Sequence, residues 1–152
     1  MAVTFIWPAE PTRKVSEYRE NRADTRSLDI TESGTRLIYA TADGIVSRSY
    51  VSASVGECIM IEHEVNGEIW ESVYAHLRSG SREVQDGDEV KQGQPIGLMG
   101  ETGTATKQHL HFELHKGNWN IRKSNAVDPL KYLQKDLTIP VKTNVTNENV
   151  YT

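Results

Sequence analysis

One segment of the chain alternates polar and apolar side chains without a break: His109-Leu110-His111-Phe112-Glu113-Leu114-His115. Successive side chains of a β-strand point to opposite faces, so the leucines and the phenylalanine share one face and the polar residues share the other. The segment predicts a strand that covers a hydrophobic core. Residues two apart in a strand are roughly 6–7 Å apart, so His109 and His111 can reach a common site.

Short segments rich in Val, Ile, Tyr and Trp, bounded by turn residues, predict the other strands of a sheet. The expected strands are Leu37–Ala40, Gly44–Val51, Cys58–His63, Ile69–His76 and Leu110–Lys116. Asn66-Gly67, between the third and the fourth, is typical of a tight hairpin. We therefore expect an all-β domain, mostly antiparallel, built as a sandwich or barrel with a groove.

The C-terminal part of the chain predicts one short helix. Asp128 would cap it, Pro129 would take its first position, and Leu130 and Leu133 would face the core. After Lys135 the composition shifts towards Thr, Asn and Val. We expect one domain over residues 1–135 and an extended tail over residues 136–152.

Composition narrows the class of protein. The chain has 152 residues, of which 37% are hydrophobic and 25% are charged. This is long enough for one soluble domain with a core of its own. A net charge of -4 without clustered Lys and Arg argues against nucleic-acid binding. No apolar run approaches the length of a membrane span, which is about 20 residues. The single cysteine, Cys58, lies in a predicted strand and is expected to be a buried apolar residue.

The start of the chain also bears on localisation. Met1 to Pro8 lacks the basic and apolar regions of a secretory signal. We therefore expect a target outside the cell membrane to be reached within a larger assembly, such as a phage particle (a virion), or by a dedicated release route.

Two further segments could carry chemistry. In Tyr74-Ala75-His76-Leu77, alternation places Tyr74 and His76 on the same face, and an imidazole there could serve as a general base near neutral pH. In Leu28-Asp29-Ile30, the lone carboxylate is either a turn residue or an oxygen ligand for a metal such as zinc. The residues alone leave these alternatives open.

Taken in order, the segments resemble one family. Tyr-Ala-His-Leu at 74–77, a glycine-punctuated run from Val84 to Gly103, and His-Leu-His-Phe-Glu at 109–113 are similar to the core of lysostaphin/LytM-type zinc endopeptidases. The similarity extends over about residues 5–133. Members of this family hydrolyse peptide cross-links of bacterial peptidoglycan. The resemblance implies this fold, zinc as the cofactor and a cell-wall peptide as the substrate.

The resemblance also assigns roles to residues. It implies that Asp29 and His111 bind zinc, and that His76 and His109 are catalytic, orienting a metal-activated water and stabilising the developing charge. Tyr74 is a candidate for substrate binding. Trp119, in a loop after the histidine strand, is another, with core packing as its alternative.

Two positions depart from the family pattern: Ser27 replaces a Gly, and a zinc ligand is missing. The family's first zinc ligand is a His four residues before the Asp, but Thr25 stands there, and no His precedes His63. A hydroxyl is a poor zinc ligand, so we expect zinc binding and activity to be weak or absent. Asp24 or Glu20, a residue of another subunit, or a water could fill the gap. Arg22 and Arg26 flank it and would repel a cation.

The sequence leaves three alternative functions for this chain. The first is a peptidoglycan endopeptidase with an altered zinc site. The second is an inactive structural module that binds a partner or the cell wall, for example as a plug or adaptor in a phage tail tip. The third is a phosphotransferase-type carrier domain, in which His76 and His111 would be the histidine pair. A lipoyl or biotinyl carrier would need a Lys at a hairpin tip, which the sequence lacks.

Overall fold

The computed structural model describes residues 5–10, 15–16 and 27–134 of the chain. The described strands are β1 (Val15–Ser16), β2 (Leu28–Ile30), β3 (Leu37–Tyr39), β4 (Gly44–Ser52), β5 (Gly56–Val65), β6 (Glu68–Leu77), β7 (Glu89–Val90), β8 (Pro95–Leu98), β9 (Leu110–Lys116) and β10 (Ala126–Val127). A 3-10 turn, η2 (Pro129–Lys131), follows them. The tail predicted for residues 136–152 lies outside the described residues.

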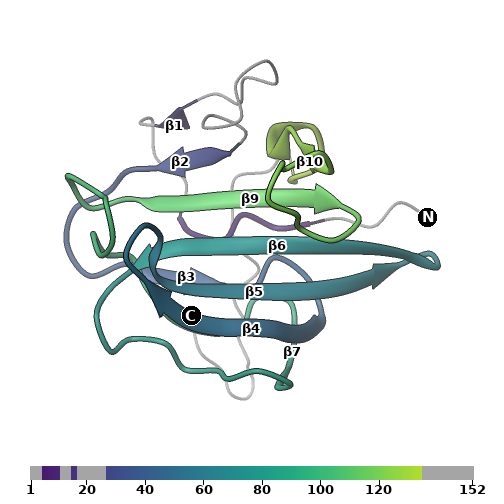
Figure 1. Cartoon of the computed structure of the whole chain (residues 1–152), viewed down its shortest axis with the longest axis horizontal. Helices are drawn as coiled ribbons and strands as arrows, with labels where there is room; N and C mark the ends of the chain where they lie inside the picture. The colour runs from purple at the N-terminus through teal and green to yellow at the C-terminus, as the bar shows by residue number, and fades with distance from the viewer. Residues whose placement is uncertain (1–4, 11–14, 17–26, 135–152) are drawn as a thin grey trace, which may run out of the picture.

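The described strands form two antiparallel sheets. The larger runs in the order β1-β2-β9-β6-β5-β4-β7, with β10 also paired to β9, and the smaller consists of β3 and β8 (Figure 1). In the described part of the chain β1 and β7 are the edge strands of the larger sheet, which is therefore not a closed barrel. Of the two predicted architectures, the sandwich is the one observed. The five predicted strands are confirmed as β3, β4, β5, β6 and β9, each within a few residues of its expected bounds.

The predicted hairpin between β5 and β6 is confirmed. Val65 pairs with Glu68 across a two-residue loop, and the loop residues Asn66 and Gly67 have φ values of 52° and 81°. Two positive φ values define the hairpin turn whose twist matches that of the flanking strands, which is why an Asn-Gly pair stands there.

The hydrophobic core lies between the two sheets. The inner face of β9 supplies Leu110, Phe112 and Leu114, each with 0% of its surface exposed, as the alternation predicted. Ile38 of β3 and Ile96 of β8 close the core from the smaller sheet. The histidine-bearing face of β9 is therefore the outer face of the larger sheet.

A second, smaller apolar cluster lies on that outer face. Cys58 and Met60 of β5 pack there with Val73 and Ala75 of β6, and Trp119 packs against them. Cys58 is fully buried, as predicted. Trp119 belongs to the loop of residues 117–125 between β9 and β10, which we call the covering loop because it lies over this face.

The predicted C-terminal helix is reduced to one turn. Asp128 caps it as expected, accepting a hydrogen bond from the Leu130 N–H at 3.0 Å, and Pro129 is its first residue. The prediction for Leu130 is wrong, because its side chain is 41% exposed, whereas Leu133 is buried. The turn ends early because the chain then pairs with the N-terminal segment, where Phe5 and Leu133 form a parallel bridge.

In the part of the chain that the structure describes, no helix has the length and apolar character needed to cross a membrane.

Candidate functional site

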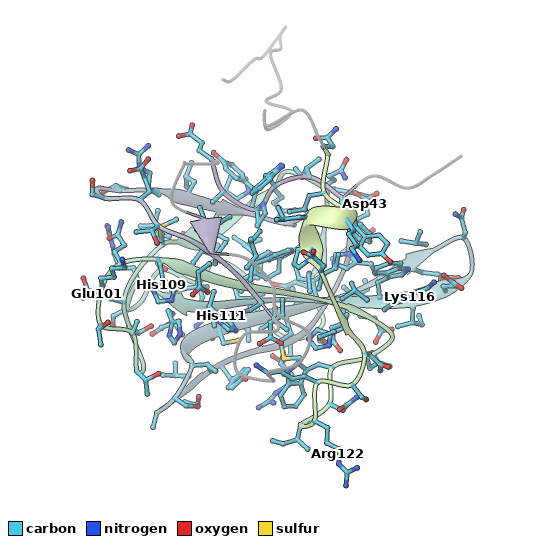
Figure 2. All side chains as sticks on the ribbon, turned by 90° about the horizontal axis from the view of Figure 1, so that it is seen from above. Asp43, Glu101, His109, His111, Lys116 and Arg122 are labelled. Carbon is cyan, nitrogen blue, oxygen red and sulfur yellow. The ribbon has the colours of Figure 1, made fainter. Side chains whose placement is uncertain are left out.

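The larger sheet brings the four predicted site residues together on its outer face. Asp29 of β2 is the direct cross-strand partner of His111 of β9. The ring of His76, at the end of β6, lies 5.7 Å from that of His111 and 5.0 Å from that of His109, centroid to centroid. Figure 2 shows His109 and His111 close together at the same end of the sheet. Their individual roles stay predictions.

Asp29 and His111 face each other in a way that suits a shared metal ion. The Asp29 Oδ1 and His111 Nδ1 atoms are 3.5 Å apart. Two ligands of a tetrahedral zinc ion, with bonds of about 2.0–2.2 Å, are expected ~3.4 Å apart. The two side chains present therefore fit adjacent positions around zinc.

The protonation of this pair reflects its burial and its neighbours. Burial pushes the pKa of Asp29 upward, but the hydrogen bond and the charge of His111, with smaller effects of His109 and His76, hold it below its ordinary value. Burial alone would lower the pKa of His111, but hydrogen bonds with Asp29 and Glu113 raise it to about 9. Without a metal, the raised pKa leaves a second proton on the His111 ring, and the charged ring forms an ion pair with the ionised Asp29. Zinc would have to displace that proton, because a ligating imidazole is neutral.

His76 reaches the site through an unusual backbone conformation. Its φ is 63°. This value lies in the left-handed region that non-glycine residues rarely occupy. In an uninterrupted strand His76 would point to the same side as Tyr74, into the core. The positive φ instead turns its ring to the outer face, while Leu77 stays in the core. Strain of this kind costs about 1–3 kcal/mol and persists where the surroundings impose it, often at functional sites.

The surroundings of His76 also set its tautomer. Its Nδ1–H donates to the Thr102 carbonyl at 2.8 Å, and its backbone N–H donates to the Val55 carbonyl at 2.8 Å. Burial lowers the pKa of His76, and nearby His111 and His109 lower it further, against the opposing effect of Thr102. The ring is therefore neutral at physiological pH, with the lone pair on Nε2. His109 is held similarly, since its Nδ1 lies 3.0 Å from the Lys107 carbonyl.

Tyr74 does not take part in this site, contrary to its candidacy for substrate binding. Its ring is 0% exposed, lies in the core against Phe112, and its hydroxyl accepts the Thr41 N–H at 2.9 Å. The prediction that Tyr74 and His76 share a face is wrong, because alternation stops at the positive φ of His76. Trp119, the other candidate, lies on the outer face and is half-buried against the apolar cluster.

Several residues that the sequence interpretation left unassigned support the site. Glu113, 3% exposed, accepts the His111 Nε2–H at 2.7 Å. Burial acts to raise the pKa of Glu113, but His111, His115 and Lys123 together hold it far below the ordinary carboxyl value. Glu113 shares the polar face in the alternating segment, which was the available signal. The Thr102 carbonyl carried no such signal, because backbone atoms are the same at every position.

The described residues supply two candidate zinc ligands, and the candidates for a third lie elsewhere in the chain. Thr25, Asp24 and Glu20 all lie outside the described residues. Within residues 5–10, 15–16 and 27–134, no group of three or more His, Cys, Asp and Glu side chains could hold a metal ion. Asp29 and His111 thus fit two positions of a zinc site. A pocket of about 590 Å³ near Glu57 and Arg82 contains none of the four predicted residues, and we place the chemistry at the histidines because the donor atoms converge there.

Comparison with known proteins agrees with this architecture. The sequence model of peptidase family M23 matches residues 24–129 of this chain. The murein hydrolase activator NlpD of Escherichia coli (strain K12) is 34% identical over 131 residues, which are 86% of this chain and 31% of NlpD. The chain thus spans about a third of the length of that relative.

Solved structures give the same result. A zinc-containing peptidase from Vibrio cholerae has a TM-score of 0.64 and 27% identity, covering 84% of this chain and 39% of that one. The catalytic domain of lysostaphin from Staphylococcus simulans has a TM-score of 0.64 and 26% identity, covering 78% of this chain and 86% of that domain. By its sequence, its fold and the arrangement of its outer-face histidines, the chain belongs to peptidase family M23, as the lysostaphin/LytM resemblance predicted.

Proposed function

We propose that this chain binds peptidoglycan peptides at the outer face of its larger sheet, and that its zinc site is incomplete, so that hydrolysis is weak or absent. The observation that carries the proposal is the Asp29–His111 pair, flanked by the rings of His76 and His109, with Thr25 at the position of the family's first ligand. The name of one relative, a murein hydrolase activator, supports peptidoglycan as the bound molecule.

The residues present define what each could contribute. Asp29 and His111 would hold zinc, which when bound supplies a Lewis acid for a peptide carbonyl and a lowered pKa for water. The neutral His76 offers an Nε2 lone pair that can accept a proton or a hydrogen bond. His109, with its Nδ1 engaged by the Lys107 carbonyl, offers its Nε2 in the same way.

Loss of one ligand sets the expected deficit in metal affinity. Structural zinc sites bind with about 10–16 kcal/mol over four ligands, or roughly 3–4 kcal/mol each. Removing one ligand then weakens zinc binding by roughly 10²–10³-fold. Such a site would fill poorly at ordinary zinc concentrations, which supports weak or absent catalysis.

A second candidate is an inactive module that regulates another cell-wall enzyme. The specific observation in its favour is the 34% identity to a protein named a murein hydrolase activator. This candidate retains the fold and the outer face and needs no metal. Delivery within a phage tail tip or another assembly stays a prediction.

Zinc titration by calorimetry, with His111→Ala as control, combined with cleavage of purified peptidoglycan, tests the proposal. We expect weak zinc binding that His111→Ala abolishes, sedimentation of the protein with peptidoglycan, and little release of soluble peptides. Sub-micromolar zinc binding together with rapid cleavage would show that another group completes the site. Failure to sediment with peptidoglycan would leave the second candidate.

A further inference from the structure

Glu113 is a buried side chain of the outer face with three hydrogen-bond partners. Its Oε2 accepts hydrogen bonds from His111 Nε2 at 2.7 Å and from Lys123 Nζ at 2.7 Å, and its Oε1 accepts one from His115 Nε2 at 2.8 Å. It is 3% exposed, and His115 is fully buried. A buried carboxylate is tolerated when its oxygens are satisfied in this way.

These contacts determine which nitrogen of His111 carries a proton. An ionised carboxylate only accepts hydrogen bonds, and the carboxylate at hydrogen-bond distance is Glu113, 2.7 Å from His111 Nε2, so Nε2 keeps the proton in the neutral ring. The other nitrogen, Nδ1, is the one that faces Asp29 Oδ1 at 3.5 Å. In the neutral ring, Nδ1 then holds the lone pair that a metal ion requires. Metal-ligating histidines are commonly oriented by a carboxylate on their other nitrogen.

Lys123 stabilises this arrangement. Its ammonium compensates the charge of Glu113, and it comes from the covering loop rather than from the sheet. The same loop carries Trp119 onto the apolar cluster. The covering loop therefore contacts the carboxylate that orients His111, which links loop position to the site.

A merely structural role for Glu113 would be to hold the covering loop. Glu71, on the adjacent strand β6, already has that role, because it accepts the Trp119 N–H at 2.8 Å and the Asn118 side chain at 3.3 Å. Glu71 is 4% exposed, lies on the same face and is the cross-strand partner of His115. No hydrogen bond or ion pair described for Glu71 involves His111, so Glu71 provides a matched control.

We propose that Glu113 is a positioning residue that fixes His111 in the Nε2–H tautomer and so presents Nδ1 as a metal ligand beside Asp29. The inference rests on the proposed zinc site, but the tautomer it specifies exists without metal. Glu113 itself binds no metal and contacts no substrate in this scheme.

The decisive measurement is the tautomer of the His111 ring in the metal-free protein, by ¹⁵N nuclear magnetic resonance at a pH high enough to neutralise the ring. We expect wild type to show a protonated Nε2 and an unprotonated Nδ1. Glu113→Gln should give a mixture of tautomers, because an amide can turn either its oxygen or its NH₂ towards the ring. Glu71→Gln should leave the wild-type signature unchanged.

Zinc affinity, measured by calorimetry on the same three proteins, provides the second readout. We expect Glu113→Gln to lower it by about 10–100-fold, the usual effect of losing such a partner, and Glu71→Gln to leave it unchanged. A wild-type His111 protonated on Nδ1, or a Glu113→Gln protein with unchanged tautomer and zinc affinity, would overturn the proposal. If Glu113→Gln does not fold, the wild-type tautomer alone decides. If wild type binds no zinc, the proposed zinc site is refuted. The tautomer measured by nuclear magnetic resonance then still tests the role of Glu113 independently.

Discussion

Replacing Tyr74 with Phe tests whether this residue serves the core or a ligand. The Tyr74 hydroxyl accepts the buried Thr41 N–H at 2.9 Å and lies 2.8 Å from the Ser72 hydroxyl. The Ser72 hydroxyl in turn lies 2.8 Å from His63 Nε2, and His63 Nδ1 lies 2.7 Å from the Asp43 carbonyl. A neutral His63 with Nδ1–H satisfies the whole series when Tyr74 donates to Ser72 and Ser72 donates to His63.

Removing the hydroxyl would leave the Thr41 N–H without its acceptor. Thr41 is 0% exposed, so water does not replace the lost partner. A buried donor left unsatisfied costs about 1–3 kcal/mol, and for a protein of this size each kcal/mol lowers Tm by roughly 2–4 °C. We expect Tyr74→Phe to lower the free energy of unfolding by about 2 kcal/mol and Tm by roughly 4–8 °C, measured by urea and thermal denaturation.

Tyr132→Phe is the matched control. Tyr132 is 36% exposed and packs edge-on against Trp70. Losing its hydroxyl should therefore change stability by no more than about 0.5 kcal/mol, the usual range for surface substitutions. Peptidoglycan sedimentation should be the same for both variants and wild type. A Tyr74→Phe protein with wild-type stability and reduced peptidoglycan binding would refute the core assignment.

Three other expectations concern the site and the core. Thr25→His, which restores the family's first ligand, should raise zinc affinity roughly 10²–10³-fold in calorimetry, and equal affinity in Thr25→Ala and Thr25→His would contradict the assignment of that position. Burial holds the pKa of His63 below its ordinary value. Neutral His63 therefore stabilises the folded protein above about pH 6.5, and this contribution is lost as the pH falls through the folded-state pKa of His63. In urea unfolding, the free energy of unfolding of His63→Gln should fall less than that of wild type as the pH is lowered. Burial raises the pKa of the Cys58 thiol to about 12. A thiol reagent should then modify the native protein only at the rate of unfolding, and fast labelling of folded protein would count against this.

The sequence predicted the strands and the faces of β9 because hydrophobic alternation records burial directly. It therefore placed His109, His111 and Glu113 on one surface. The face of His76 was not predictable in this way, because no glycine or other turn residue at that position signals the backbone φ of 63° that reverses it. The same error assigned Tyr74 to the site, although it lies in the core.

Tertiary contacts explain the other differences. The final helix has a good cap and a proline, so local signals were satisfied, but the pairing of Leu133 with Phe5 ends it after one turn. A partner so far away in the chain leaves no trace in a local pattern. The carbonyls of Thr102 and Lys107 that orient the imidazoles are likewise set by loop folding.

The two faces of β9 also bear on how such a protein can change over evolutionary time. The inner residues of β9 belong to the hydrophobic core, whereas Asp29, His109 and His111 lie on the outer face of the sheet. The strand β2, which carries Asp29, is only three residues long. Folding and chemistry thus depend on opposite sides of one strand. Substitutions that abolish catalysis need not loosen the core, and a domain built this way can lose an enzymatic activity in a single step while it persists as a stable platform on which selection can act again.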